Sequence, residues 1–318
     1  MGDPASGGVL RRPAVPPPIR VRRNILTLRP DDPIVTFYGR AIAEMRRKPI
    51  SDPLSWRYQA AIHDYPDPDT TLADRQTDDP FASATDVLPA DRSTFWRTCQ
   101  HATWFFLPWH RMYLHHFEKM IMDHVTRLGG PADWALPYWN YSRSAAARIF
   151  PEALRSGDLF VAQRDPNANA GLPFAGPDDT NITTALSESV FRGVPGNPGF
   201  GGLPPANHGG GGPGKGRVES SPHDRMHVAI SGPDPSGFMG NFTRAPLDPI
   251  FWIHHCNIDR LWEVWINAGN SNPTSADWLT SVSFPFHDST GAVVNMTSAE
   301  VVDTKAAPLS YEYDDLSP

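Results

Sequence analysis

The chain contains little cysteine: Cys99 and Cys256 are the two cysteines among 318 residues. Two distant cysteines do not make the disulfide framework of a small secreted domain. They indicate either an intracellular chain or one in which cysteine has a local task, and the sequence leaves open whether the two pair. A composition with 40% hydrophobic and 11% aromatic residues is instead sufficient for a large hydrophobic core.

The chain also lacks long apolar runs and an excess of positive charge. No apolar run approaches the length that crosses a bilayer, so we expect no membrane association. A net charge of −7 argues against a nucleic-acid-binding protein, which needs a basic face. The N-terminus has no apolar region typical of a signal peptide. We therefore expect a cytoplasmic chain or a processed, secreted mature form.

The N-terminal segment, residues 1–21, is rich in proline and predicts a flexible Pro-rich arm. No interdomain linker followed by a fresh core is visible in residues 22–318, which predicts a single domain. Breaker residues are dense in 64–92 and in 193–217, and the second of these stretches is a long glycine loop. The tail from residue 278 predicts short strands and turns. Helical periodicity marks residues 34–47, 110–128 and 254–267.

Two familiar metal motifs are absent from a chain with twelve histidines. No H-E-x-x-H zinc motif is present, and no Glu-x-x-His pair of a di-iron bundle. Histidine is a common metal ligand but also fills cores. If the histidines bind metal together, an all-imidazole site favours copper or zinc, with copper higher in the affinity order.

The stretch "CQHATWFFLPWHRMYLHHFEKM", residues 99–120, contains four of these histidines. His101 and His110 are nine apart, and nine helical residues turn through about 900°, so the two would lie on opposite helix faces. Both can reach one metal only if His101 precedes a helix that begins near Pro108. A surface histidine and a core histidine are the alternative.

Further histidines occur at helical spacings. His223 and His227 are four apart and share a face if they lie on a helix. His254 and His255 are adjacent and point about 100° apart, so only one faces a given metal. Asp259 lies on the same face as His255 and could orient an imidazole.

His63 ends an apolar helical run in "WRYQAAIHDYP". A histidine that caps the C-terminal end of a helix is the alternative to a ligand at this position.

Two motifs together are specific. "HATWFFLPWHRMYLHHFE", from His101 to Glu118, resembles the first copper signature of the type 3 copper family, which includes tyrosinases, catechol oxidases and haemocyanins. "DPIFWIHHCNID", from Asp248 to Asp259, resembles the second. The stretches "VRRNILTL", "LPYWNYS" and "LSYEYDD" also resemble family landmarks, so the resemblance covers about 22–318.

The resemblance implies a mainly α fold: a four-helix bundle around a dinuclear copper site, with long loops and a few short peripheral strands. It implies two copper ions, one on His63, His101 and His110 and the other on His223, His227 and His255. The remaining histidines would then be non-ligands: His254, His115, His116, His124, His208 and His287.

Other roles follow from the same resemblance. Cys99, two residues before His101, resembles a fungal-type cysteine that forms a thioether with that ligand, and a free buried thiol is the alternative. Glu118 and Asp259 are expected to support the ligands from behind. The tyrosines of "YEY", Tyr311 and Tyr313, resemble a motif that packs on an arginine, Arg22 or Arg23, and otherwise would be ordinary edge-strand residues.

The resemblance also suggests four residues of the substrate pocket. Glu219 resembles a glutamate that holds an active-site water. Asp224 stands where strong tyrosinases often have asparagine, and could act as a base or add negative charge. Val228 is small and leaves room above the copper, while Phe242 matches a gate position that stacks on an incoming ring.

The implied activity is that of a polyphenol oxidase, which uses O2 to oxidise o-diphenols to o-quinones, with some ortho-hydroxylation of monophenols (tyrosinase activity). A catechol oxidase or an o-aminophenol oxidase without monophenolase activity is the alternative, and a haemocyanin-like O2 carrier is a third. We expect small phenols and O2 as partners. We expect an open site because no shielding domain follows Tyr313. The sequence leaves the question of homo-oligomers undecided.

Overall fold

The computed structural model describes residues 18–65, 80–81, 83–209, 211–234 and 237–318. Helices dominate it: α1 (Pro33–Arg47), α2 (Trp56–His63), α3 (Pro89–Phe95), α4 (Phe106–Arg127), α5 (Pro166–Ala170), α6 (Thr183–Leu186), α7 (Asp224–Ser231), α8 (Pro249–Asn267) and α9 (Ala276–Leu279). None of the described helices combines the length and the apolar composition of a membrane span.

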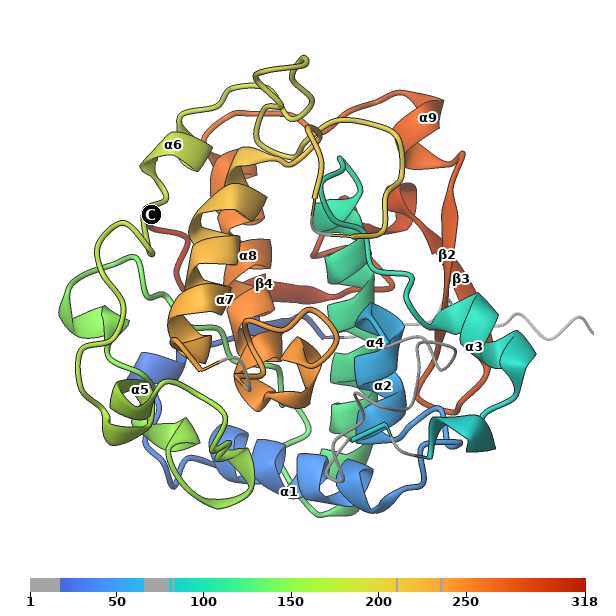
Figure 1. The fold of residues 1–318 in the computed structure, drawn as a ribbon, viewed down its shortest axis with the longest axis vertical. Coiled ribbons are helices and arrows are strands. Elements are labelled where there is room, and N and C mark those ends of the chain that lie inside the picture. The colour runs from blue at the N-terminus through green and yellow to red at the C-terminus, as the bar shows by residue number, and fades with distance from the viewer. Residues whose placement is uncertain (1–17, 66–79, 82, 210, 235–236) are drawn as a thin grey trace, which may run out of the picture.

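The described strands are short and form two separate two-stranded pairs (Figure 1). β1 (Arg20–Arg22) pairs in parallel with β4 (Tyr311–Tyr313), in the register Arg20 to Tyr311. β2 (Ser283–His287) and β3 (Val293–Thr297) form an antiparallel hairpin. The expected class, mainly α with a few peripheral strands, is confirmed.

Local sequence signals set where the central helices begin. The Asp248 side chain accepts a hydrogen bond from Ile250 N and Pro249 follows it, so α8 begins five residues before the predicted 254. Ser55 caps α2 in the same way, through Tyr58 N. Pro108 lies in the first turn of α4, as expected, because a missing N–H costs nothing there.

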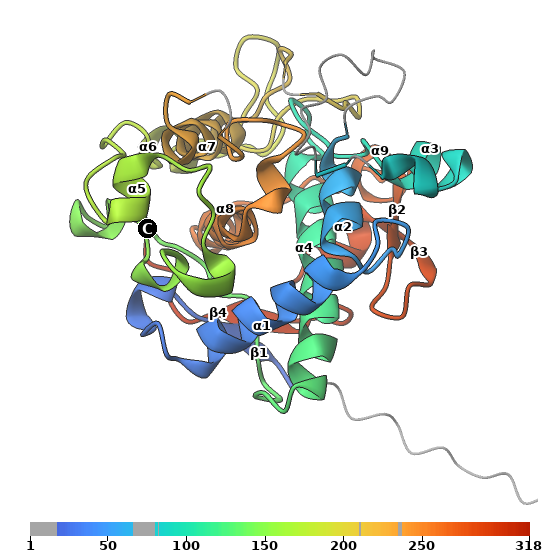
Figure 2. The same cartoon turned by 60° about the horizontal axis from the view of Figure 1, so that its bottom comes forward.

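Helices α2, α4 and α8 lie near the centre of the molecule in both ribbon views, and α7 lies in front of α8 in Figure 1 and above it in Figure 2. The long helices α4 and α8 pack directly on each other. Phe117 of α4 stacks on Trp252 of α8 with ring centroids 3.5 Å apart, and Trp56 of α2 packs against both rings. These aromatic contacts bury the apolar faces whose periodicity is visible in the sequence.

The predicted N-terminal arm, residues 1–21, overlaps the first strand of the structure. Residues 1–17 lie outside the described residues, but Arg20 and Val21 belong to β1. The reason is electrostatic: Arg20 and Arg22 are buried beside the Glu118 carboxylate of α4, so this end of the arm is fixed to the core.

A buried ion-pair network joins the two ends of the chain to both long helices. Arg22 donates to Glu118 of α4 at 2.9 Å and to Asp259 of α8 at 3.2 Å. Its guanidinium lies 3.6 Å above the Tyr311 ring, and Tyr311 and Tyr313 both donate to Asp259. Arg22 therefore is the arginine of the tyrosine motif, whereas Arg23 is exposed.

We expect Arg22→Ala to lower the free energy of unfolding by about 3–5 kcal/mol, because it leaves two carboxylates buried with less compensation. Denaturant unfolding measures the change. Arg23→Ala is the matched control, and we expect it to stay within about 0.5 kcal/mol of the wild type. Equal losses in both variants would contradict the role given to Arg22.

Candidate metal centre

The first histidine group gathers three segments. His63 is the last residue of α2, His101 lies in the loop before α4, and His110 lies on α4. One ring nitrogen of each lies within 4.8 Å of the others, and all three side chains are buried. The requirement that His101 precede the helix is met, so two histidines nine residues apart converge on one point.

Backbone carbonyls orient the rings of this group. His63 Nδ1 lies 3.0 Å from the carbonyl oxygen of Phe242, and His110 Nδ1 lies 2.8 Å from that of Phe106. When Nδ1 carries the proton and donates it, Nε2 presents its lone pair. Both Nε2 atoms are buried without a hydrogen-bond partner, as metal ligands without their ion would be.

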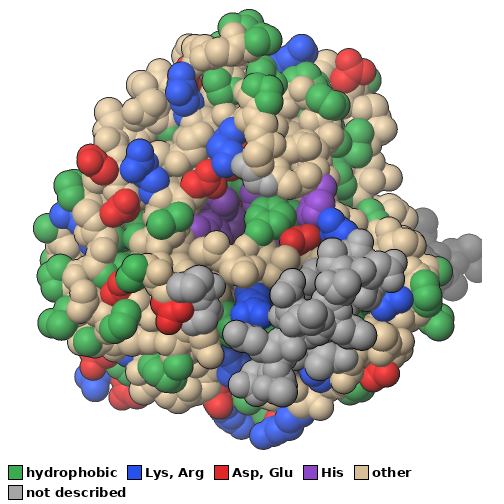
Figure 3. Space-filling view, in the orientation of Figure 1, with side chains coloured by type: hydrophobic (Ala, Val, Ile, Leu, Met, Phe, Trp, Pro, Cys, Tyr) green, Lys and Arg blue, Asp and Glu red, His purple; other side chains and the backbone are tan. Residues whose placement is uncertain are grey.

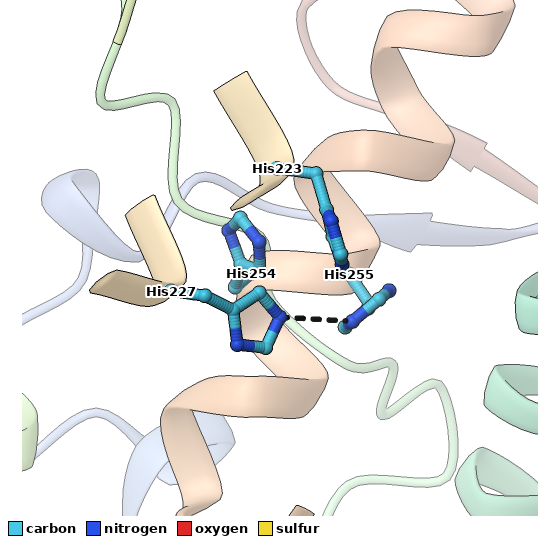
Figure 4. Close-up of side chains that lie close together, drawn as sticks. All are labelled: His223, His227, His254 and His255. Atoms are coloured by element: carbon cyan, nitrogen blue, oxygen red, sulfur yellow. Dashed lines mark hydrogen bonds between the residues drawn. The ribbon is translucent and has the colours of Figure 1, made fainter. Parts of the chain in front are cut away.

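The second group comes from α7 and α8 (Figure 4). His223 precedes α7 rather than lying inside it, but its ring still lies 4.5 Å from that of His227. His227 Nδ1 contacts the Met239 carbonyl oxygen at 2.7 Å. The Nε2 atoms of His227 and His255 are 3.4 Å apart. Two imidazoles on one tetrahedral ion, with bonds of about 2.0–2.1 Å, would have nitrogens about 3.3 Å apart.

His254 lies closer to this group than we expect of a non-ligand. It offers a nitrogen within 4.8 Å of those of His223, His227 and His255. Its ring stacks on that of His223, its Nδ1 lies 3.3 Å from the Tyr141 hydroxyl, and its Nε2 is buried without a partner. The choice of His255 as the ligand therefore stays a prediction from the resemblance.

The two groups face each other across the α4–α8 contact. The rings of His110 and His255 are stacked, with centroids 4.4 Å apart and planes 8° from parallel. His101 and His223 are 5.8 Å apart, centroid to centroid. The two groups thus form one centre with room for two neighbouring ions.

Burial controls the charge of the centre. Removal from water, followed by the mutual proximity of the imidazoles, holds several histidine pKa values well below their usual range: those of His63, His101, His110, His223, His254 and His255. Neutral imidazole is the form that binds metal. A buried set of neutral imidazoles without a carboxylate ligand suits copper.

A cavity of about 250 Å³ opens over the centre. The space-filling view shows histidine side chains at the floor of a hollow, with a hydrophobic side chain between them (Figure 3). The Phe242 ring lies 4.9 Å from that of His63 and 4.7 Å from that of His101. Val228 stands at the rim and is 65% exposed. Both residues belong to the cavity lining, and their roles toward a substrate stay predictions.

Glu219 is fully buried and lies outside the described cavity lining. Both of its oxygens accept from the Ala102 N–H, at 2.8 and 3.0 Å. Burial raises its pKa to about 8, even though the Ala102 hydrogen bond opposes the shift. Its direct contact is therefore with the peptide that follows His101, and the water-holding role stays a prediction.

Asp224 is not a free carboxylate. Its Oδ1 lies 2.9 Å from His223 Nδ1, and its Oδ2 lies 2.5 Å from the Lys215 ammonium nitrogen. Sequence reasoning did not single out Lys215. The feature that could have indicated it is its position as the one lysine of the glycine loop, nine residues before Asp224.

The two carboxylates expected behind the ligands have a different task. Glu118 and Asp259 bind arginines and tyrosines in the network described above, and the prediction that Asp259 orients an imidazole is wrong. The reason is that two buried guanidinium groups, of Arg22 and Arg111, each bind one oxygen of the Asp259 carboxylate.

Cys99 is a buried free thiol in the structure. Its sulfur lies 3.3 Å from His208 Nδ1, and His208 Nε2 lies 3.1 Å from Asp64. Burial, reinforced by the carboxylates of Asp64 and Glu219, raises the pKa of the thiol well above its usual value. The thioether between Cys99 and His101 stays a prediction.

Fold and site together define a helical protein with a dinuclear, all-histidine metal centre. Residues 53–193 and 178–268 match the common central domain of tyrosinase, and residues 272–318 match the polyphenol oxidase middle domain. The chain therefore belongs to the tyrosinase family. Its two histidine groups fit the two copper ions of this type 3 copper family.

Individual relatives agree. The chain is 38% identical over 312 residues to a tyrosinase of Hahella sp., covering 93% of this chain and 63% of the relative. It is 29% identical over 297 residues to a chloroplastic polyphenol oxidase of Vitis vinifera, covering 88% and 45%. The crystal structure of the Grenache grape polyphenol oxidase aligns with a TM-score of 0.68 at 24% identity, over 98% of this chain and 90% of that one, and shows the same fold. The chain spans 63% and 45% of the lengths of the two sequence relatives.

Copper content tests the ligand set. We expect the wild type to retain two copper ions per chain after dialysis, and His255→Gln to retain about one, because one ion loses an imidazole. His254→Gln should keep two, as should the control His116→Gln, whose ring contacts Met296. Loss of an ion from His254→Gln, with two retained by His255→Gln, would reverse the assignment.

Proposed function

We propose that the chain is a copper-dependent polyphenol oxidase that uses O2 to oxidise o-diphenols to o-quinones. The observation that carries the proposal is the pair of facing histidine groups beneath an open cavity of about 250 Å³. When bound, the copper pair supplies O2 binding and two-electron redox chemistry. The relatives named tyrosinase and polyphenol oxidase support the same activity.

The side chains around the centre position the phenol ring and orient the imidazoles. The Phe242 ring, which lies over His63 and His101, offers an aromatic face on which the substrate ring can stack. Val228, which is 65% exposed in the cavity lining, offers a small apolar side chain beside that ring. The Nδ1 contacts to carbonyls hold the imidazoles in one tautomer while the substrate enters and leaves.

An o-diphenol gives up two electrons and two protons, whereas a monophenol must first lose a phenolic proton whose pKa is near 10. Asp224 is the carboxylate of the described cavity lining, and it is already paired with Lys215 and His223. Burial raises the pKa of Glu219 to about 8, and the Ala102 N–H already donates to both of its oxygens. We therefore infer strong diphenol oxidation and some, slower, ortho-hydroxylation of monophenols.

The o-aminophenol alternative depended on a free carboxylate that attracts an amine. The Lys215 ammonium group occupies that carboxylate in the structure. The structure therefore favours the two phenol-oxidising activities. Of these, a tyrosinase hydroxylates monophenols and a catechol oxidase does not.

A paired assay on the copper-loaded protein tests the proposal. O2 uptake and quinone absorbance are followed first with a catechol and then with the matching monophenol, and we expect a fast first reaction and a slower second one. His110→Ala, which removes a central imidazole, should abolish both. Reversible O2 binding with no catechol turnover would replace the enzyme with an O2 carrier.

A further inference from the structure

The glycine loop brings one cation to the cavity. Lys215 is the single lysine of residues 193–217. Its side chain is 24% exposed, lines the cavity over the metal centre and pairs with Asp224. Sequence resemblance gives this residue no role, and the oxidase mechanism above uses it only as the partner of Asp224.

The backbone on both sides of Lys215 is tightly fixed. A Cβ on Gly214 would lie 2.4 Å from the Ala102 carbonyl oxygen, and one on Gly216 would lie 2.6 Å from that of Phe200. Leu203 N donates to the Gly214 carbonyl at 2.9 Å. Only glycine permits such a close approach of two backbones. The loop therefore positions Lys215 directly beside the segment that carries His101.

Lys215 and Asp224 are the oppositely charged side chains of the described cavity lining. The other lining residues are the histidines of the metal centre and uncharged side chains. Whatever charge the metal ions add, Lys215 offsets the negative charge of Asp224. Without it, a single negative charge would face the cavity at Asp224, which is 35% exposed.

We propose that Lys215 is a specificity-determining residue that favours o-diphenols with a neutral or carboxylate-bearing substituent over those with an ammonium group. This inference rests on the proposed oxidase function. An ammonium group has three donors, so Lys215 can bind Asp224 and still donate to an acceptor on the substrate. A substrate ammonium group would instead meet a like charge at Lys215 and would have to share Asp224 with it.

The test compares kcat/KM for three catechols with different two- or three-carbon substituents: 3,4-dihydroxyphenylpropionate, 4-ethylcatechol and dopamine. In Lys215→Met, we expect the ratio of the carboxylate substrate to the ammonium substrate to fall about tenfold or more, as for the loss of a charge-assisted hydrogen bond. Lys215→Arg should keep the ratio within about threefold, because the charge remains.

Lys305→Met is the matched control. It removes the same charge from an exposed lysine that pairs with Glu312, and we expect an unchanged ratio. If Lys215→Met lowers all three values by one common factor, Lys215 only holds the loop and the specificity role is overturned. If the copper-loaded wild type oxidises none of the three catechols, the proposed oxidase function fails and the specificity role falls with it.

Discussion

The buried guanidinium group of Arg22 is the contact that holds the architecture of the metal centre together. It binds Glu118 on α4 and Asp259 on α8, the two helices that each carry a central histidine. His110 lies eight residues before Glu118, and His255 lies four before Asp259. Because these carboxylates are buried, their pairing with one arginine fixes how far α4 and α8 can slide past each other. The stacking of His110 on His255 depends on that fixed register.

A second constraint acts at the centre itself. A buried group of imidazoles is stable only if the rings are neutral and their N–H groups have acceptors. Loop carbonyls of Phe242 and Met239 provide two such acceptors, and the helix carbonyl of Phe106 provides a third. The segment 239–242 therefore serves both groups, and its Phe242 side chain lines the cavity above His63 and His101. Support of the ligands and shaping of the pocket are in this way performed by the same few residues.

The sequence predicted best those features that a regular spacing or a long motif encodes. The apolar periodicity of α4 and α8 predicted these helices, and the resemblance of two stretches to copper signatures implied the two histidine groups. The sequence could not predict contacts that single polar residues make across loops, such as that of Lys215 with Asp224. Asp259 was misjudged because helical spacing gives the face of a residue but not the arginines that compete for it. The adjacent His254 and His255 both reach the second group, since a helix face about 100° away still borders the same centre.

The most direct test of the dinuclear assignment is a crystal structure of the copper-loaded protein with anomalous scattering at the copper edge. The account requires two copper peaks about 3.5–4 Å apart, one bound by His63, His101 and His110 and the other by His223, His227 and His255. A single copper ion, or an ion held outside these two histidine groups, would contradict it.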